Sequence, residues 1–295
     1  MTSIAVIAHQ KKTLGGGLPE LRQLLDDQGL TDPLWYEVPK SRKAPKAARR
    51  AVEEGADLVL LWGGDGTVQR CIDVLAGSPV TVAVLPAGTA NLLANNLGIP
   101  IDLPAAVDIA LHGARRRLDV GVLNGERFAV MAGAGFDAIM MKEADSGLKD
   151  RFGQLAYVWT GARATQVKAP KVKVKVDGKP WFKGRASCLL LGNMGTLSGG
   201  LTAFRHAEPD DGLLEIGVVT AEGPVQWARL LGRLATGHAE RSKLARMTRG
   251  REVRVKFDRP TTYQLDGGAR PAARRLRAKI EPGAVTICVP EGKRQ

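Results

Sequence analysis

The sequence predicts an α/β plus β fold: a Rossmann-like domain over residues 1–120 and a β-sandwich domain over residues 121–295. Three observations lead to this prediction. Apolar strands alternate with helical segments over the first 125 residues, and two of those strands end at glycine turns. From about Arg117 onward, short strands separated by turn residues follow one another. The final strand is a candidate to return to the first domain.

The strands of the first half are continuous apolar runs, as expected for a parallel sheet that is covered on both faces. We expect strands over residues 3–8, 34–38, 56–62 and 81–86, with helices over 18–29, 41–55 and 67–77. Ligands of such sheets bind beyond the carboxyl ends of the strands. Both glycine turns, at residues 63–66 and 87–88, follow a strand directly, which makes them the first candidates for a binding site.

The second half predicts a β domain with two helices. We expect strands over 117–123, 126–133, 171–178, 186–194, 213–220, 251–257, 261–268 and 284–290, and helices over 148–165 and 223–237. In the segment KVKVKV (Lys171–Val176) the lysines point to one face and the valines to the other. This pattern favours a solvated edge strand, and a face held against anionic lipid is the alternative. We expect a ligand cleft between the two domains.

The charge of the chain points to an anionic partner. The formal net charge is +13 and the pI is near 9.9, which suits an acidic membrane surface, a phosphorylated small molecule or nucleic acid. Aromatic residues make up 5% and do not interleave with the basic runs, so we expect no nucleic acid. No apolar run reaches the ~20 residues of a membrane span. Three scattered cysteines favour a reducing cytoplasm over a disulfide framework or a zinc site.

The segment GGDGT (Gly63–Thr67) carries the clearest chemistry. Glycine lets the backbone approach an anion closely, successive N–H groups can form a phosphate nest, and the following helix adds its positive N-terminal end. Asp65 has three candidate roles: holding Mg²⁺, orienting a hydroxyl group, or capping the helix. The second turn, PAGTAN (Pro86–Asn91), offers Thr89 and Asn91 at a neighbouring strand end. Two such turns favour one shared phosphate site.

GGDGT followed by PAGTANLLANNLGIP resembles the catalytic domain of the diacylglycerol kinase and sphingosine kinase family, especially its bacterial lipid kinases. The resemblance extends through Arg115–Ala138, the glycine-rich Gly192–Val219, and LDGG (Leu265–Gly268) with the hairpin that follows. It implies an NAD kinase-like nucleotide domain with a β-sandwich, ATP as phosphate donor, and a lipid hydroxyl such as that of diacylglycerol as acceptor, at an anionic membrane surface.

The resemblance also implies site residues. By similarity, those expected around the ATP phosphates are Gly64, Asp65, Gly66, Thr67 and Thr89, and Gly63 and Asn91 of the same two turns are further candidates. Lys12 is a candidate to bind phosphate as a point charge, with plain surface as the alternative, because the segment after the first strand departs from the family's Asn-Pro and glycine. Asp211, with backbone oxygens of Glu208 and Leu213, matches the structural Mg²⁺ site of the family. The residue pattern alone would favour a plain turn at this point.

Two departures from the family pattern bear on catalysis. Arg70 stands where an acid is expected after GGDGT, and the closing Asp-Gly-Glu reads Asp266-Gly267-Gly268, so no carboxylate at 268 can accept a proton. Asp65 and Asp266 are therefore the candidate catalytic carboxylates, and Arg70 or Arg270 the candidate to neutralise phosphate charge. The alternatives are an NAD-kinase-like small-molecule kinase and a catalytically weak nucleotide- or phospholipid-binding protein.

We expect a cytoplasmic protein that associates transiently with the membrane. The sequence leaves the oligomeric state open, a homodimer included.

Overall fold

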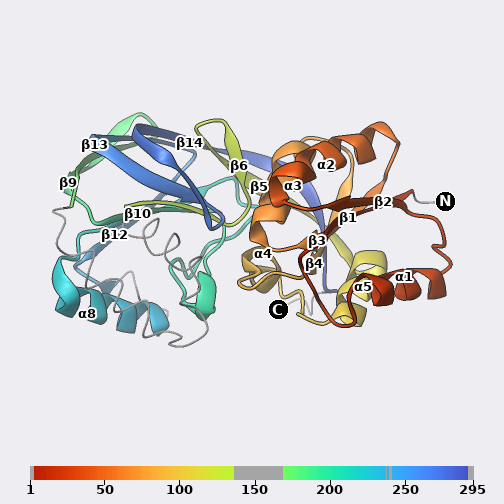
Figure 1. The fold of residues 1–295 in the computed structure, drawn as a ribbon. Helices are drawn as coiled ribbons and strands as arrows, with labels where there is room; N and C mark the ends of the chain where they lie inside the picture. The colour runs from red at the N-terminus through yellow and green to blue at the C-terminus, as the bar shows by residue number, and fades with distance from the viewer. Residues whose placement is uncertain (1–2, 136–168, 237, 239–240, 292–295) are drawn as a thin grey trace. The chain divides into compact units, whose positions relative to one another are not determined.

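The computed structural model describes residues 3–135, 169–236, 238 and 241–291 (Figure 1). The helix expected over 148–165 lies outside these described residues. The chain forms two compact units, one of residues 1–120 together with 282–295 and the other of residues 121–281. Among the described residues, no helix has the length and apolar character needed to cross a bilayer.

A parallel sheet forms the centre of the first unit. Its strands lie in the order β4-β3-β1-β2 and are all parallel. The end of β14 (Gly268–Val289) adds a further parallel strand beside β4, where Thr286 pairs with Thr81. Every residue of β1 and β3 is buried, because helices cover both faces. The strands are β1 (Ile4–His9), β2 (Leu34–Val38), β3 (Leu58–Gly63) and β4 (Thr81–Pro86).

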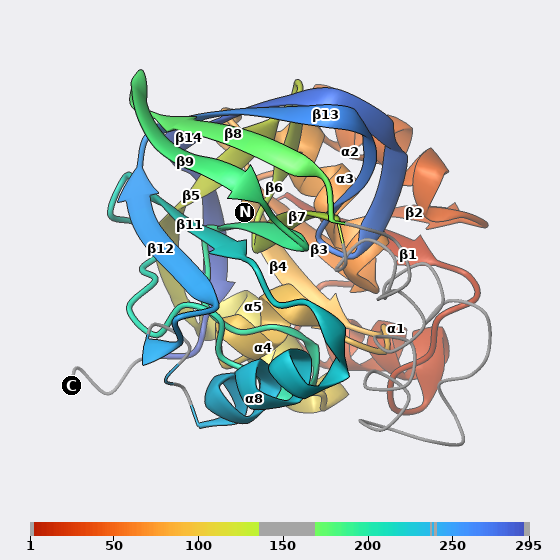
Figure 2. The same ribbon diagram turned by 90° about the vertical axis from the view of Figure 1, so that its left-hand side faces the viewer.

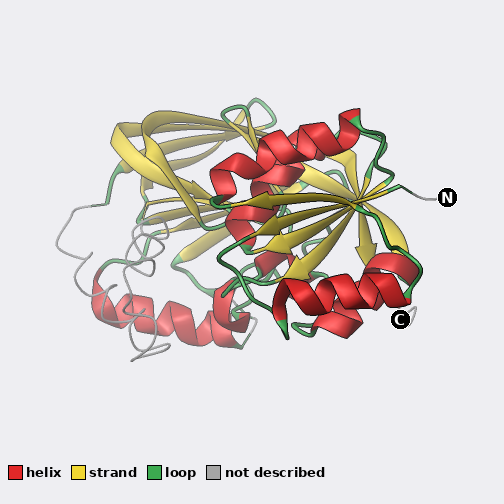
Figure 3. Cartoon of the chain, turned by 45° about the vertical axis from the view of Figure 1, so that its right-hand side comes forward, coloured by secondary structure: helices red, strands yellow, loops and turns green. Residues whose placement is uncertain are grey.

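Helices α2 and α3 pack together on one face of this sheet, and α1 and α5 on the other (Figure 3). α2 shows the sequence reason: Ala44, Ala47, Ala48 and Ala51 recur at helical spacing and are all buried. The helical elements are α1 (Gly17–Asp27), the short 3₁₀ turn η1 (Ser41–Lys43), α2 (Ala44–Glu53), α3 (Asp65–Leu75), α4 (Leu92–Asn96) and α5 (Leu103–His112).

The second unit is a sandwich of antiparallel strands. One layer has the order β12-β11-β10-β7-β13 (Figure 2). The other has the order β9-β8-β13-β14 and continues through β5, which pairs with β14, to β6. The strands are β5 (Ala114–Leu123), which enters from the first unit, β6 (Glu126–Phe128), β7 (Met131–Gly135), β8 (Lys171–Val176), β9 (Lys179–Arg185), β10 (Cys188–Gly192), β11 (Leu214–Val219), β12 (Ala245–Gly250), β13 (Glu252–Leu265) and β14.

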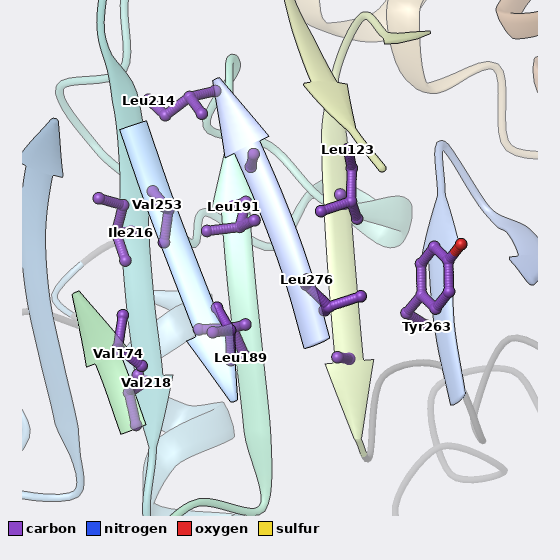
Figure 4. Close-up of a cluster of buried hydrophobic side chains, with 14 of the residues drawn as sticks. Leu123, Val174, Leu189, Leu191, Leu214, Ile216, Val218, Val253, Tyr263 and Leu276 are labelled. Carbon is purple, nitrogen blue, oxygen red and sulfur yellow. The ribbon is translucent and has the colours of Figure 1, made fainter. Parts of the chain in front are cut away.

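Alternating apolar residues of both layers meet in one core (Figure 4). Leu189, Leu191 and Ile216 come from one layer, and Val174 and Val253 come from the other. Leu230 of helix α8 (Gly223–Ala235) packs in a second apolar cluster. The short η2 (Ser198–Gly200) lies between β10 and β11. Two layers of alternating strands are what the sequence predicts for the second half. The predicted fold class is confirmed.

Several boundaries differ from expectation. The strands expected over 251–257 and 261–268 are one bulged strand, β13, because the ladder to β14 continues past a register shift between Lys256 and Thr261. The expectation of an edge position for Lys171–Val176 is wrong, since β8 pairs with β9 on one side and with β13 on the other. The sequence reasoning missed β9, β12, α4, α5 and most of the length of β14.

Candidate active site

The two glycine turns lie at the carboxyl ends of adjacent strands. β3 pairs with β4 as far as Gly63 and Pro86, and the N–H of Ala87 donates to the carbonyl of Gly63 at 3.1 Å. α3 begins at Asp65, two residues earlier than the sequence suggests, with extended Gly64 as its N-cap. The helix therefore starts inside the GGDGT turn itself, and its N-terminal end faces the same strand edge as the turn.

Glycine is required where the two turns meet. A Cβ atom built on Gly88 would overlap the Cα of Gly64 and would lie 2.6 Å from Oδ1 of Asn91. A Cβ on Gly64 would in turn lie 3.0 Å from the Cα of Gly88. The Cα atom of the facing glycine is a backbone atom and cannot rotate away as a long side chain can. The two turns thus meet backbone to backbone at Gly64 and Gly88.

Polar side chains hold this pair of turns together. Oδ1 of Asp65 accepts a hydrogen bond from the backbone N–H of Leu92 at 2.5 Å, which ties the first turn to the start of α4. Asn91 is buried in the left-handed region, at φ 47°, and it braces its own turn. Its Oδ1 accepts from the N–H of Gly88 at 2.8 Å, and its Nδ2 donates to the carbonyl oxygens of Pro86 and Gly88. Thr89 is exposed at the tip of the second turn.

Thr67 supports the first turn from inside. Its side chain is 1% exposed, and its Oγ1 lies 2.9 Å from the hydroxyl oxygen of Ser41. Ser41 follows β2, so the carboxyl end of a third strand contributes to this region. Sequence reasoning missed Ser41, and its position three residues after the end of an apolar strand is the signal that could have found it. Gly66 also faces Ser41, since a Cβ at Gly66 would lie 3.9 Å from its hydroxyl oxygen.

Lys12 follows β1 and is fixed to the strand that carries GGDGT. The indole N–H of Trp62 in β3 donates to the carbonyl oxygen of Lys12 at 3.0 Å. His9, at the end of β1, is buried, and its Nδ1 accepts the backbone N–H of Lys11 at 3.2 Å. Burial first, and the Lys12 cation second, lower the pKa of His9. His9 therefore lies at the strand end as a buried hydrogen-bond acceptor, with a lysine charge beside it.

In the second unit, Asp266 forms the first half of a tight turn between β13 and β14. Asp266 and Gly267 have φ values of 42° and 81°, the combination that a two-residue type I′ hairpin needs. The carboxylate is 4% exposed and accepts three backbone N–H groups, from Ala129 at 2.7 Å, Val130 at 2.9 Å and Met131 at 2.8 Å. Its oxygens are thus occupied in holding the segment before β7.

Gly268 and Arg270 lie side by side after this turn. A Cβ on Gly268 would lie 2.9 Å from Nη1 of Arg270. The guanidinium donates from Nε to Oε2 of Glu126 at 2.8 Å, and from Nη1 to the carbonyl oxygen of Gly268 at 3.0 Å. A buried arginine therefore takes the space beside the position where the family pattern has glutamate. Arg70 lies in α3 and is half-buried.

The expected magnesium ligands lie in one turn before β11. Oδ1 of Asp211 accepts the N–H of Leu213 at 2.9 Å, while Glu208 is exposed at the start of the turn. Burial raises the pKa of Glu215, against the effect of Arg249, which pairs with its carboxylate at 2.7 Å, and the negative charge of Asp211 adds to the rise. Oxygen donors and local negative charge fit Mg²⁺ chemically. Within the part of the chain that the structure describes, no group of three or more acidic, histidine or cysteine side chains could hold a metal. Any ion here would thus depend on backbone oxygens and water.

Comparisons with known proteins agree with this arrangement. The model of the diacylglycerol kinase catalytic domain matches residues 7–123, and that of the YegS C-terminal NAD kinase beta sandwich-like domain matches residues 130–289. A Pseudomonas aeruginosa protein named "Probable lipid kinase YegS-like" is 32% identical over 252 residues, which are 83% of this chain and 82% of that one. The chain belongs to the bacterial diacylglycerol kinase and lipid kinase family.

Further relatives support the same placement. The diacylglycerol kinase of Bacillus subtilis is 30% identical over 232 residues, 76% of this chain and 75% of the relative. The crystal structure of a diacylglycerol kinase from Bacillus anthracis superposes with a TM-score of 0.78 at 21% identity, covering 97% of this chain and 96% of that one. An NAD kinase from Archaeoglobus fulgidus in complex with ATP shares the fold, with a TM-score of 0.53 at 11% identity and coverage of 97% and 93%. The expectation of an ATP-using lipid kinase is confirmed.

Proposed function

We propose that the protein transfers the γ-phosphate of ATP to a lipid hydroxyl, such as that of diacylglycerol, at an anionic membrane surface. Family membership supports the lipid acceptor, since relatives that share about 30% of their residues carry lipid kinase names. The observation that carries the proposal is the contact between the two glycine turns, where Gly64 and Gly88 meet backbone to backbone. This contact supports the proposal because it fixes both turns at one strand edge, where the N-terminal end of α3 offers backbone N–H groups to phosphate.

In this proposal the residues of the two turns bind and position the ATP phosphates. Gly63, Gly64, Gly66 and exposed Thr89 line the phosphates, while Asn91 and buried Thr67 keep the turns in shape. Lys12 adds a positive charge at the end of the neighbouring strand. Phosphoryl transfer depends mainly on positioning and on charge stabilisation of this kind, so a rigid pair of turns is the main catalytic requirement.

The acceptor hydroxyl needs a carboxylate to orient it. We assign this role to Asp65, whose Oδ1 holds Leu92 and whose helix begins inside the phosphate turn. Asp266 is the weaker candidate, because three backbone N–H groups already occupy its carboxylate. In this proposal Asp266 has a structural role within the second unit, where it fixes the segment over residues 129–131. Arg270 is paired with Glu126, which leaves Lys12 and Arg70 as the candidate cations for phosphate charge.

Magnesium bound with ATP would neutralise phosphate charge. A second, structural ion would find oxygen donors in the turn with Glu208, Asp211 and Leu213. We propose that Asp211 supplies the single carboxylate of that site, with carbonyl oxygens of Glu208 and Leu213 beside it. The hydrogen bond from the Leu213 N–H to Oδ1 of Asp211 pre-orients the carboxylate within the turn.

An Asp65→Asn variant tests the assignment of the acceptor-orienting group. The amide oxygen can still accept the N–H of Leu92, so the turn and its thermal stability should be retained, while the negative charge is lost. We expect the rate of label transfer from [γ-³²P]ATP to diacylglycerol to fall about 10²–10⁴-fold. Asp108→Asn, an exposed aspartate of α5 paired with His112, is the matched control and should leave the rate unchanged. A folded Asp65→Asn protein with wild-type turnover would refute the role.

A further inference from the structure

The sheet β9-β8-β13-β14 has one face in the core and one face covered with positive charge. Along β8 and along β13 from Glu252 to Phe257, the apolar residues are buried and the charged residues between them are exposed. Strand β14 alternates in the same way from Arg275 to Ile280. The outward positions of the four strands carry these ten exposed cations: Lys171, Lys173, Lys175, Lys183, Arg185, Arg254, Lys256, Arg275, Arg277 and Lys279.

The register of the strands places like charges directly opposite one another. Lys173 is paired with Lys183 on one side and with Lys256 on the other, and Lys256 is paired with Arg275. These four residues form a line across all four strands, which we call the basic row. A second, parallel line joins Lys175, Arg254 and Arg277 through the same ladders. Side chains at opposed positions lie about 5 Å apart, where like charges destabilise a sheet.

Few acids compensate for these charges. On the outward face of the four strands we find Glu252, which lies 3.6 Å from Arg254, and Asp258, while Lys279 pairs with Glu281 at 2.9 Å. Among the residues that the structure describes, no member of the basic row makes an ion pair within 4.0 Å. The fold gains nothing from such an array, so its charge is better explained by an external anionic partner.

The face also has an amphipathic recess. At the end of the strands a cavity of about 550 Å³ is lined by five of the cations together with Val172, Phe257 and Asp258. Its lining combines positive charges, which could bind the phosphate of a phospholipid headgroup, with apolar side chains, which could contact the glycerol backbone. Nucleic acid fits less well, because no aromatic side chain of these described strands is exposed for a base to stack on; half-buried Trp181 of β9 packs against the core.

We propose that this face docks the protein on a bilayer of anionic phospholipid. The proposal deepens the proposed function by assigning membrane contact to one face of the second unit. It rests on the proposed function for the lipid acceptor. Each cation near an anionic bilayer strengthens binding by about fivefold, and salt screens the attraction. Neutralising the four cations of the basic row should therefore weaken vesicle binding by roughly 10²–10³-fold.

The test compares two proteins with the same net charge. In the first, Lys173, Lys183, Lys256 and Arg275 are changed to Gln. In the control, four exposed cations elsewhere, Lys43, Lys46, Arg49 and Arg229, are changed to Gln. Binding is measured by sedimentation with phosphatidylcholine vesicles, with and without phosphatidylglycerol. A third variant that exchanges lysine for arginine, and arginine for lysine, at the basic row keeps the charge and should bind as the wild type does.

The proposal predicts loss of binding to phosphatidylglycerol vesicles in the basic-row variant alone, with unchanged turnover of a short-chain diacylglycerol presented as dissolved monomer. Equal vesicle binding by the basic-row and control variants would overturn the proposal. It would also be overturned if the basic-row variant lost binding to duplex DNA while its binding to vesicles stayed as in the wild type. The proposed function fails separately. If wild-type protein phosphorylates no lipid yet binds vesicles through the basic row, the docking face stands and the kinase assignment does not.

Discussion

Replacing Asp266 by Asn separates a structural role for this carboxylate from a catalytic one. The amide keeps the size of the side chain, and Asn tolerates the left-handed backbone at φ 42°. Its oxygen can still accept the N–H groups of Val130 and Met131, both of which bond to Oδ1. The amino group then faces the N–H of Ala129, so that one buried donor loses its acceptor.

The expected cost follows from these contacts. One hydrogen bond to a charged group is worth about 1.5–3 kcal/mol, and the two that remain lose their charge assistance. We expect the Asp266→Asn protein to lose about 2–4 kcal/mol of unfolding free energy, a large share of the ~5–15 kcal/mol that holds a domain together. Equilibrium urea denaturation followed by tryptophan fluorescence measures this loss.

Asp177 offers a matched control for this experiment. It also precedes a glycine in a hairpin turn, has φ 47°, and accepts the N–H groups of Arg251 and Glu252 at a single oxygen, yet it is exposed. Asp177→Asn should change the unfolding free energy by no more than about 0.5 kcal/mol. If Asp266→Asn were as stable as the wild type but inactive, Asp266 would act in catalysis and the structural explanation would be wrong.

Three further substitutions test other parts of the site. Gly88→Ala forces the two glycine turns apart and should weaken ATP binding at least about tenfold by calorimetry, whereas Gly232→Ala, in open space on α8, should have no effect. The pKa of His9 is lowered in the folded protein, so its burial costs stability as the pH falls below the unfolded value of ~6.5. Thermal melts of His9→Gln should accordingly depend less on pH between 7 and 5, and an unchanged pH profile would contradict this linkage. Gly268→Glu places a carboxylate beside the guanidinium of Arg270, which can pair with it, so we expect a folded protein whose kcat stays within about threefold. A rise in kcat above about tenfold would show that the missing glutamate limits the rate.

The sequence predicted those elements well in which a residue type points to one kind of structure. Continuous apolar runs predicted the buried parallel strands, and glycines after two of those runs predicted backbone turns at one edge of the sheet. What it did not show is that Gly64 and Gly88 pack against each other, since that contact depends on the register of β3 and β4. The brace from Asp65 to Leu92 depends on the same register.

Charge-rich segments were the harder part. The stretch Arg275–Ile280 alternates charged and apolar residues, as a strand does. Its many cations, however, favoured the interpretation of a charged surface segment over that of a strand. Only the pairing of β14 with β13 shows that the apolar residues face the core. The role of Asp266 was hidden for a similar reason, because its three N–H partners lie more than 130 residues earlier in the chain.

The central claim is that the two glycine turns serve a kinase whose acceptor is a lipid. The most direct measurement incubates the purified wild-type protein with [γ-³²P]ATP, Mg²⁺, diacylglycerol in mixed micelles and NAD in the same reaction, and separates the products by phase extraction. We predict label in phosphatidic acid and none in the nucleotide fraction beyond ATP and its hydrolysis products. Label in NADP with none in the lipid phase would contradict the account.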